Sequence, residues 1–312
     1  MQKLDGQLIT VLGGGGFLGR YVVQRLLARG ARVRVAQRAP RAATFLKPLG
    51  GLGQTQFVAA DVRDPASIAR AVAGSDAVVN LVGAFDNMQA VQADGAGHVA
   101  AAASAAGARA LVHVSAIGAD RASPSTYGRS KGDGEAAVRD AFPAAAILRP
   151  SIVFGREDQF INRFAAMIRL SPVIPVIAPD SKFQPVYVGD VAEAVFAALG
   201  ADAAGRTFEL GGPQVLTMAA LQRWIADAIG RSPLFVEVPD VAASALASGF
   251  GWAPGAPITK DQWLMLQSDN VVAADAAGLA DLGVAPTSLA AVADDWLVQY
   301  RRHGRFAVRK PA

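Results

Sequence analysis

A run of glycines between an apolar segment and an amphipathic one constrains this chain more than any other feature. Residues 8–12 have the length and apolar character of a buried strand, and residues 17–29 follow a helical pattern. Between them stands the heptapeptide GGGGFLG of residues 13–19. A glycine turn that joins a strand to a helix points the first amides of the helix at a bound anion. The turn therefore predicts a dinucleotide site rather than a merely flexible loop.

Each glycine of this turn has an expected role. Gly13 permits the tight turn, Gly16 lets the backbone approach a pyrophosphate, and Gly19 lets the helix pack closely on the sheet. Phe17 and Leu18 lie between these glycines and are expected to contribute to the same cofactor site.

The glycine turn opens a regular alternation of strand-like and helical segments. The expected strands are residues 8–12, 32–36, 55–59, 77–82, 110–114 and 145–148, and the expected helices are 17–29, 68–72, 91–106 and 127–141. Near-continuous apolar strands that alternate with helices are typical of a parallel sheet covered on both faces. We predict a doubly wound α/β fold, the NAD(P)-binding Rossmann fold, for residues 1–150.

After Pro150 the pattern becomes irregular. Shorter elements are expected around residues 160–167, 186–188, 191–199, 207–210, 218–229, 234–238, 258–267 and 289–300. They predict a smaller C-terminal α+β lobe over residues 151–312, with the chain crossing back to the sheet near 185–210. Such a lobe would cover the carboxyl edge of the sheet, where open α/β folds bind ligands.

The composition excludes several classes of protein. The 312 residues are 52% hydrophobic and contain no cysteine, so disulfide scaffolds, cysteine nucleophiles and cysteine-based metal sites are ruled out. Nucleic acid is not an expected partner, because only 7% of residues are aromatic and no five basic residues are consecutive. No stretch reaches about 18 uninterrupted apolar residues, and the first strand leaves no room for a signal peptide. We expect a cytoplasmic protein without a transmembrane segment.

The net charge of +4 is unevenly distributed. Residues 6–60 contain eight basic and no acidic side chains, whereas residues 61–300 contain 16 basic and 25 acidic ones. The last twelve residues carry five positive charges, which could reach anionic lipid or an acidic partner or simply belong to a frayed end. The basic first segment is where a phosphate-rich cofactor is expected.

Cofactor choice depends on the end of the second strand, which reads Val-Ala-Gln37-Arg38. An NAD site usually offers a carboxylate here to the ribose 2′-hydroxyl, whereas an NADP site offers an arginine. Arg38 is expected to bind a 2′-phosphate through charge-assisted hydrogen bonds. NADP(H) is therefore the preferred cofactor, and NAD(H) remains the alternative.

Further cofactor contacts are expected where the later strands end. Asp61 is a candidate acceptor for the adenine amino group, although an aspartate in this position is as often a helix N-cap, and both interpretations stay open. The other positions assigned to the cofactor site are Val62, Leu81, Val82, Gly83, Pro150 and Ile152.

A second motif, Tyr127-Gly-Arg-Ser-Lys131, stands at the start of an expected helix. The i,i+4 spacing places both side chains on one helix face, where the ammonium of Lys131 would lower the pKa of the phenol. A tyrosine tuned in this way exchanges a proton with a substrate oxygen while hydride moves to or from a nicotinamide. Ser115, on the strand before the motif, is the third candidate catalytic residue.

These residues resemble the extended and atypical short-chain dehydrogenases/reductases and, within them, the NADPH-binding 39 kDa accessory subunit of respiratory complex I and its bacterial relatives. The resemblance extends over nearly the whole chain and is carried by three stretches: GGGGFLGRYVVQRL, RDAFPAAAILRPSIVFGREDQFINRFAAMIRL and QPVYVGDVAEAV. The segment Gly155–Asn162 is the most specific part. The resemblance implies NADPH at the glycine turn and Arg38, with Tyr127 and Lys131 at the nicotinamide end.

One departure from the family pattern bears on activity. Active extended members carry a serine or threonine on the fifth strand, and alignment places Ile117 on that position and Ser115 two residues before it. Ser125 could replace the hydroxyl only if its loop folds inward, and a serine beside a proline is more often turn chemistry. In the accessory subunit the NADPH is held structurally, and the altered serine position agrees with such a role.

Two functions therefore remain. The first is an accessory or assembly subunit of NADH:ubiquinone oxidoreductase with structurally held NADPH, peripheral to the inner membrane, with complex I subunits at its inner face as partners. The second is an active NADP-dependent oxidoreductase, or an NAD-dependent epimerase/dehydratase-type enzyme, that uses Tyr127 and Lys131.

Several other residues carry no functional expectation. His98 and His113 have no second histidine or carboxylate at ligand spacing, so no metal site is expected. Phe250 and Trp252 are interpreted as ordinary core under a loop, with a partner-facing or membrane-grazing patch as the alternative.

Overall fold

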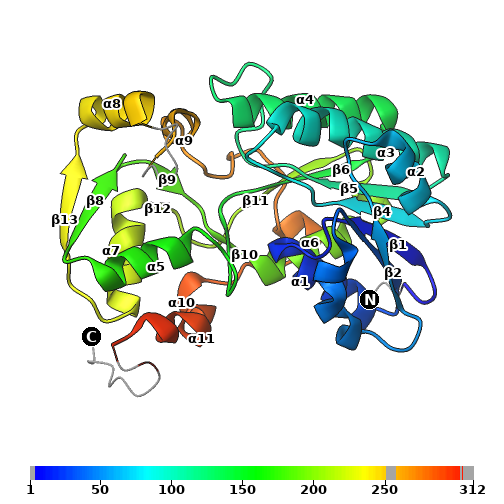
Figure 1. The fold of residues 1–312 in the computed structure, drawn as a ribbon, viewed down its shortest axis with the longest axis horizontal. Coiled ribbons are helices and arrows are strands. Elements are labelled where there is room, and N and C mark those ends of the chain that lie inside the picture. Colours follow the sequence, from blue (N-terminus) through cyan, green and yellow to red (C-terminus); the bar gives the residue numbers. More distant parts are fainter. Residues whose placement is uncertain (1–3, 251–257, 303, 305–312) are drawn as a thin grey trace. The chain divides into compact units, whose positions relative to one another are not determined.

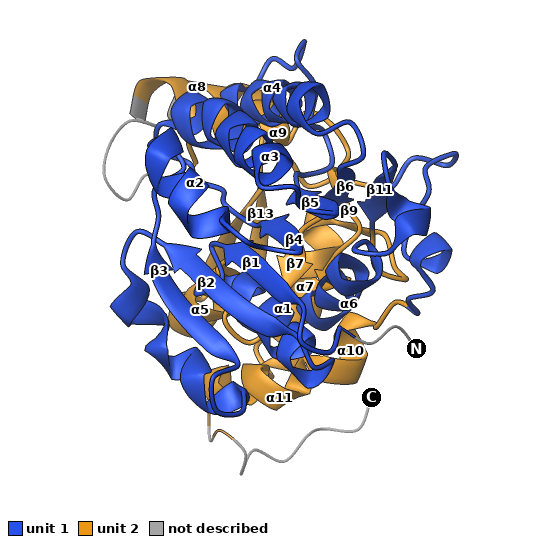
Figure 2. Cartoon of the chain, turned by 90° about the vertical axis from the view of Figure 1, so that its right-hand side faces the viewer, with its two compact units in different colours: residues 1–150, 188–210, 272–285 blue, residues 151–187, 211–271, 286–312 orange. Residues whose placement is uncertain are grey.

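The computed structural model describes residues 4–250, 258–302 and 304 (Figure 1). The chain divides into two compact units, each assembled from three segments (Figure 2). Unit 1 contains residues 1–150, 188–210 and 272–285, and unit 2 contains residues 151–187, 211–271 and 286–312. Trp252 and most of the basic C-terminal tail lie outside the described residues, and the side chain of Phe250 is likewise not described.

Unit 1 is built on a seven-stranded sheet in which every pair of neighbouring strands is parallel. The strands follow the order β11-β6-β5-β4-β1-β2-β3. Their bounds are β1 Leu8–Leu12, β2 Arg32–Gln37, β3 Thr55–Ala59, β4 Ala77–Asn80, β5 Ala110–Val114, β6 Ala146–Pro150 and β11 Thr207–Leu210. The predicted doubly wound fold is confirmed.

Helices cover both faces of this sheet. Figure 2 shows α2, α3 and α4 along one face and α1 and α6 along the other. The bounds are α1 Phe17–Ala28, α2 Pro65–Val72, α3 Gly95–Ala105, α4 Thr126–Ala141 and α6 Val188–Ala197, with 3-10 segments at Pro40–Leu49, Ala201–Ala203 and Ala280–Leu282.

The core of unit 1 lies where the apolar strands meet the helices. All four residues of β4 are buried, as expected for a central strand covered on both faces. Leu12, Val78 and Leu111 of the sheet pack against the helical layer, which contributes Val99 and Val138. Burial of these side chains fixes the strands that end at the candidate site.

One helical segment departs from the expected pattern. The helix predicted over residues 91–106 begins with a π-helical turn, η2, over Gln89–Asp94, and continues as α3. The turn packs closely on its surroundings, because a Cβ at Gly134 would lie 2.2 Å from the carbonyl oxygen of Gln92 and one at Gly95 would lie 2.7 Å from Val62. The wide turn thus brings Gln92 to a fixed place beside α4, which hydropathy alone does not reveal.

Unit 2 combines helices with three two-stranded sheets. Two sheets are parallel, β7 Val153–Phe154 with β10 Val186–Tyr187 and β8 Val173–Ile177 with β13 Leu234–Val238, and the third is antiparallel, β9 Lys182–Phe183 with β12 Leu216–Thr217. The helices are α5 Ile161–Leu170, α7 Met218–Ala228, α8 Asp240–Phe250, α9 Lys260–Met265, α10 Leu289–Val292 and α11 Asp294–Leu297, followed by a 3-10 turn at Val298–Tyr300.

The helix predicted over residues 289–300 is therefore three short turns. They follow one another directly, so Leu289, Ala293, Trp296 and Leu297 still reach one core cluster of unit 2. The i, i+4, i+7, i+8 spacing indicates which side chains are buried, even though the helix itself is interrupted.

The segment Gly155–Asn162, the most specific part of the resemblance, forms a closed turn at the start of α5. The buried carboxylate of Asp158 accepts backbone hydrogen bonds from Phe160, Ile161 and Asn162 at 2.9, 2.7 and 3.3 Å. The side-chain Nδ2 of Asn162 donates to the carbonyl oxygen of Asp158 at 2.9 Å. These bonds satisfy amides that a helix leaves unpaired at its first turn, so the segment has a structural role within unit 2.

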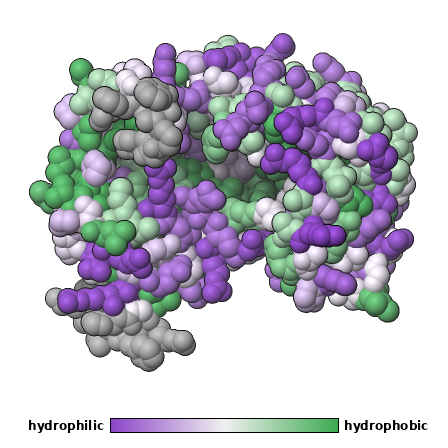
Figure 3. All heavy atoms as spheres, in the orientation of Figure 1, coloured by the Kyte–Doolittle hydropathy of each residue, from purple (hydrophilic) through white to green (hydrophobic). Residues whose placement is uncertain are grey.

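Apolar side chains also gather on the surface of unit 2. Val173, Leu234 and Val236 of the β8–β13 sheet are 46%, 64% and 45% exposed, and Figure 3 shows hydrophobic residues over these strands. No helix among the described residues of either unit is both long enough and apolar enough to cross a membrane.

Candidate functional site

The glycine turn has the backbone geometry that its sequence predicts. Gly13 has a φ of +76°, which glycine adopts at low cost, and the amide of Gly16 donates to the carbonyl oxygen of Gly13 at 3.0 Å. A Cβ at Gly19 would lie 2.4 Å from that same oxygen and 2.6 Å from the backbone of Gly14. Only glycine at position 19 therefore lets α1 pack this closely on the turn.

The start of α1 fits an anionic group. No side chain caps the helix at Gly16, and its first turn contains no acidic residue. The first amides of a helix lack acceptors within the helix and carry the positive end of its dipole. Phe17 and Leu18 begin the helix, so their amides belong to this set of donors. The turn can therefore hold a pyrophosphate.

Gln37 is a contributor that sequence reasoning did not single out. Its Oε1 accepts a hydrogen bond from the amide of Gly15 at 3.0 Å, and its Nε2 donates to the carbonyl oxygen of Ala39 at 2.7 Å. The first bond ties the end of β2 to the glycine turn, and the second orients the Gln37 side chain against the segment that follows β2. A neutral amide thus occupies the position next to Arg38 at which an NAD site commonly has a carboxylate.

Arg38 and Asp61 follow β2 and β3, which are neighbouring strands. Arg38 is exposed. Asp61 pairs with Arg63, with a Nη2–Oδ2 distance of 2.6 Å, and hydrogen bonds from Arg63 hold the pKa of Asp61 at about 2, helped by the charge of Arg38. The carboxylate of Asp61 is thus ionised and engaged, whereas Asp64 is the residue that caps α2, through the amide of Ala66.

The end of β4 is fixed by a buried amide. Asn80 accepts from the amide of Val82 at 3.1 Å, and its Nδ2 lies 3.2 Å from Nδ1 of His113 on β5. Burial, together with the charge of Lys131, lowers the pKa of His113 to about 3, so this histidine is neutral. Leu81, Val82 and Gly83 leave the strand from this anchored point. Val62 is buried, and its carbonyl oxygen lies 2.8 Å from Nδ1 of His98.

The Tyr127–Lys131 pair lies in the first turns of α4, whose N-cap is Ser125. The hydroxyl of Ser125 accepts from the amide of Gly128 at 2.9 Å, so this serine caps the helix. Lys131 is buried, donates to the carbonyl oxygen of Val114 at 3.4 Å and lies 5.9 Å from the centre of the Tyr127 ring. Both motif side chains therefore stand on one helix face beside the end of β5.

The electrostatics of the pair differ from the expectation. Burial lowers the pKa of Lys131 to about 8, partly offset by the Glu135 carboxylate. Burial also raises the pKa of Tyr127 to about 12, instead of the lowering that Lys131 was expected to cause. Desolvation of the phenol is the cause of this shift. The phenol is thus protonated at neutral pH and can donate a proton but not accept one.

Buried polar atoms without partners mark the neighbourhood of Lys131. Among the described residues, Oγ of Ser115 and Oε1 of Gln92 are buried and have no hydrogen-bond partner. A Cβ at Gly83 would lie 3.7 Å from Nζ of Lys131 and 4.0 Å from Oε1 of Gln92. Unsatisfied buried polar groups are costly, so these two atoms are candidate partners for a bound hydroxyl-rich group such as a ribose.

Pro150 and Ile152 belong to different units. The carbonyl oxygen of Pro150, in unit 1, accepts from the amide of Ile117 at 3.1 Å, and the carbonyl oxygen of Ile152, in unit 2, accepts from the amide of Val186 at 2.9 Å.

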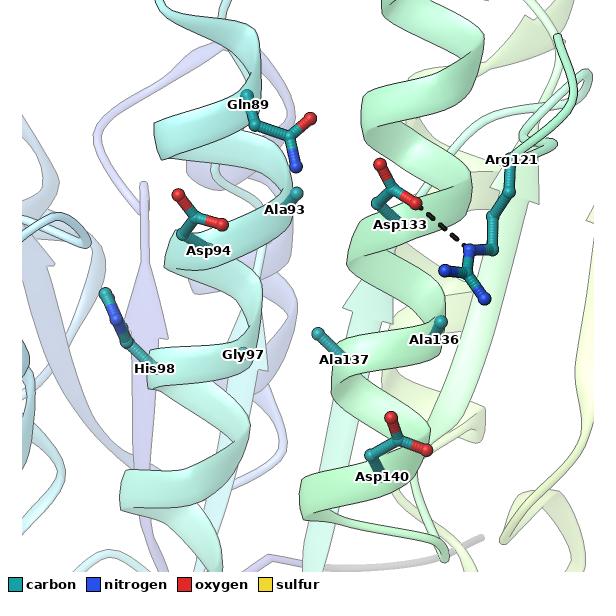
Figure 4. A pocket seen from close by; sticks show the side chains of 10 residues that line it. All are labelled: Gln89, Ala93, Asp94, Gly97, His98, Arg121, Asp133, Ala136, Ala137 and Asp140. Atoms are coloured by element: carbon teal, nitrogen blue, oxygen red, sulfur yellow. Dashed lines mark hydrogen bonds and ion pairs between the residues drawn. The ribbon is translucent and has the colours of Figure 1, made fainter.

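A hollow of about 440 Å³ lies on the surface of unit 1 along α3 and α4 (Figure 4). Its charged lining includes Asp94, Asp140 and the pair formed by Arg121 and Asp133, with an Nε–Oδ1 distance of 3.1 Å. None of the residues predicted for the cofactor or for catalysis lines it.

Comparisons with known proteins agree with this geometry. Residues 9–211 match the model of the NAD dependent epimerase/dehydratase family. The mitochondrial NADH dehydrogenase [ubiquinone] 1 alpha subcomplex subunit 9 of Arabidopsis thaliana is 35% identical over 97% of this chain and 80% of its own length. The same-named protein of Rattus norvegicus is 38% identical over 92% of this chain and 78% of its own.

Solved structures share the fold at lower identity. The NADPH-dependent quinone oxidoreductase QOR2 of Escherichia coli, solved with NADPH, superposes with a TM-score of 0.73 at 20% identity and covers 91% of this chain and 97% of its own.

Proposed function

Because the chain belongs to the NAD dependent epimerase/dehydratase family, we propose that unit 1 holds NADP(H) and that the protein is an accessory or assembly subunit of NADH:ubiquinone oxidoreductase. The observation that carries the cofactor proposal is the uncapped start of α1 behind the glycine turn. When bound, the nicotinamide supplies hydride chemistry, and the side chains described above bind and orient it.

NADP(H) is favoured over NAD(H) by the end of β2. Gln37 is neutral and its Oε1 is committed to Gly15, so the end of β2 itself offers no carboxylate to bind a 2′-hydroxyl. Arg38 is exposed next to it and is the group that would bind the 2′-phosphate. The absence of acidic residues from residues 6–60 adds to this preference.

A held cofactor, rather than one that turns over, is favoured by the nicotinamide end. Burial raises the pKa of Tyr127 to about 12, so the phenol is protonated at neutral pH, which disfavours it as the base of an oxidation but not as the proton donor of a reduction. Ser125, the possible replacement for the fifth-strand hydroxyl, caps α4 instead. The buried Ser115 Oγ and Gln92 Oε1 would still bind the ribose of a resident dinucleotide.

The assembly proposal is supported by the relatives, which are named as subunits of NADH dehydrogenase. The partners would be complex I subunits at the inner face of the membrane, and the protein would be cytoplasmic and peripheral to the inner membrane. Purification from native membranes at low detergent tests this proposal. Co-migration with the NADH:ubiquinone oxidoreductase activity is expected, and a protein that runs free in every fraction would contradict it.

The cofactor proposal is tested by titrating NADPH and NADH against Arg38→Asp. Loss of a charge-assisted contact should weaken NADPH about 10- to 100-fold and leave NADH nearly unchanged. Arg70→Asp is the matched control, because Arg70 is an exposed residue of α2. Equal losses for both cofactors, or a loss as large in the control, would show that Arg38 does not bind the 2′-phosphate.

The second candidate is an active NADP-dependent oxidoreductase or an NAD-dependent epimerase/dehydratase-type enzyme. It is favoured by one observation, the placement of Tyr127 and Lys131 on one face of α4. A purified protein that consumes NADPH with a carbonyl compound, and loses this activity in Tyr127→Phe, would favour the enzyme over the held cofactor.

A further inference from the structure

Exposed apolar side chains gather on unit 1 in the segment that joins β2 to β3. Among the described residues of unit 1, the large apolar side chains exposed to solvent are Phe45, Leu49, Leu52 and Phe85. The first three stand within eight residues of one another; Phe45 and Leu49 are 46% and 43% exposed, and Leu52 is fully exposed. Single exposed apolar side chains are ordinary, but a cluster of them marks a surface that another molecule covers.

The 3-10 segment Pro40–Leu49 is anchored by its buried side chains. Ala43 and Leu46 are completely buried, which fixes the segment on unit 1. Phe45 lies between these two residues in the sequence and stays at the surface, where the guanidinium carbon of Arg20 is 4.8 Å from the centre of its ring. Since the inner positions are filled, the exposed ring is a fixed feature of the surface.

Leu52 stands at the corner of a short turn with defined hydrogen bonds. The amide of Gln54 donates to the carbonyl oxygen of Gly51 at 3.1 Å, and Gly53 between them has a φ of +76°. The side chain of Gln54 fastens this turn, because its Oε1 accepts from the amide of Gly51 at 2.7 Å and its Nε2 donates to the carbonyl oxygen of Ala31 at 3.1 Å. The turn therefore presents Leu52 to solvent as a protruding apolar side chain.

The charged side chains that this part of the chain contributes are all basic. Residues 6–60 contain no acidic side chain. Arg41 and Lys47 of the 3-10 segment are exposed. Arg32 is exposed as well, and the amide of the residue after it donates to the carbonyl oxygen of Gln54 at 2.7 Å, which places Arg32 beside the turn. Protruding apolar side chains thus stand among cations, a combination that complements a negatively charged membrane surface.

We propose that unit 1 binds the interface of an anionic lipid membrane through a surface made of Phe45, Leu49, Leu52, Arg32, Arg41 and Lys47. The apolar side chains enter the boundary between headgroups and acyl chains, and the cations pair with anionic headgroups. A protein partner would need a pocket shaped for the protruding Leu52, whereas the fluid acyl region accepts a side chain of any shape. The inference names a surface and a lipid class for the proposed location at the inner membrane, and it does not depend on the cofactor.

The test is co-sedimentation of the full-length protein with two kinds of vesicle, in the presence and in the absence of NADPH. One kind is phosphatidylcholine alone, and the other is an equimolar mixture of phosphatidylcholine and phosphatidylglycerol. Binding to the anionic vesicles should be stronger by about fivefold for each of the three cations, or roughly 100-fold in all. This preference should shrink as the salt concentration rises, because salt screens exposed charges.

Two variants with matched controls assign the binding to this surface. Leu52→Ser should weaken binding to the anionic vesicles about tenfold, whereas Leu170→Ser, at an exposed leucine of α5, should leave it unchanged. Lys47→Gln should weaken binding to the anionic vesicles about fivefold and leave binding to the neutral ones unchanged. Arg70→Gln, at an exposed arginine of α2, is its control. All four side chains are exposed, so these variants should fold normally, which circular dichroism checks.

No binding to the anionic vesicles, equal binding to the neutral ones, binding that survives Leu52→Ser, or an equal loss in Leu170→Ser would each overturn the inference. If the unsubstituted chain bound no vesicle but Leu52→Ser lost co-migration with NADH:ubiquinone oxidoreductase, the surface would belong to a protein partner and the lipid assignment would be wrong. A protein that binds anionic vesicles through Leu52 and never co-migrates with the oxidoreductase would contradict the proposed assembly role and leave the lipid surface standing.

Discussion

Substitution of Gly19 by alanine probes the contact on which the glycine turn depends. The added Cβ would lie 2.4 Å from the carbonyl oxygen of Gly13 and 2.6 Å from the backbone of Gly14, far inside van der Waals contact. Both neighbours are main-chain atoms, so no side-chain rotation relieves the overlap. Either α1 must move away from the turn or the turn itself must change.

The magnitude follows from two opposing effects. Overpacking of a close contact costs about 1–3 kcal/mol. Alanine inside a helix gains about 0.8–1 kcal/mol over glycine. Because the overlap involves three backbone atoms, the cost should be at the upper end, and the net loss of unfolding free energy should be about 2 kcal/mol. The displaced amides would also weaken NADPH binding, by about tenfold or more.

Chemical denaturation and cofactor titration measure the two effects. Gly249→Ala provides the matched control, because Gly249 is also helical and a Cβ there would meet no atom of the described residues within 4 Å. The control should gain about 0.5–1 kcal/mol with unchanged NADPH affinity. If Gly19→Ala were as stable as the control and bound NADPH as tightly as the unsubstituted chain, the argument from close packing would be refuted.

Substitutions at two buried charged residues provide further tests. Burial lowers the pKa of Lys131 to about 8, so between pH 8 and 10 the unfolded chain binds more protons than the folded one, and the free energy of unfolding should rise with pH in that range. Lys131→Met should abolish this rise and stabilise the cofactor-free protein at pH 7 by up to about 3 kcal/mol. Chemical denaturation at each pH measures both effects. A persistent slope in the variant would assign the titration to another group. Asp158→Ala removes the acceptor of several backbone amides at the start of α5 and should lower the stability measured by thermal unfolding by about 2 kcal/mol or more. Asp158→Asn keeps one acceptor oxygen and should retain most of the stability. Equal losses in both variants would show that the negative charge, not the acceptor oxygen, matters.

The sheet of unit 1 could be predicted because its strands are short, apolar and separated by helical patterns. Hydropathy reports burial, and the inner strands of a parallel sheet are buried on both faces, so β1 and β5 have the predicted bounds. The return of residues 272–285 to unit 1 has no such signal, because this segment contains only a 3-10 turn and no strand or helix of its own.

The candidate site was harder to predict because its chemistry depends on desolvation. The spacing of Tyr127 and Lys131 places them on one helix face, but it does not reveal that burial acts on both groups and reverses the expected direction of the tyrosine pKa. From the sequence, Gln37 indicated only that no acidic residue stands at the end of β2. Its hydrogen bond to the amide of Gly15 depends on the folded glycine turn and could not be predicted.

The order of strands in space has a consequence for any attempt to divide this protein. Strand β11 forms one edge of the sheet beside β6, and the guanidinium of Arg149 on β6 lies 3.5 Å from Glu209 on β11. A fragment that stops at Pro150 would keep the whole glycine turn and both motif residues but would expose the hydrogen-bonding edge of β6. Open strand edges pair with other chains. The shortest fragment of this fold that stays monomeric must therefore include residues that follow the first segment of unit 2, and expression boundaries drawn after the last helix–strand repeat would yield an aggregating sheet.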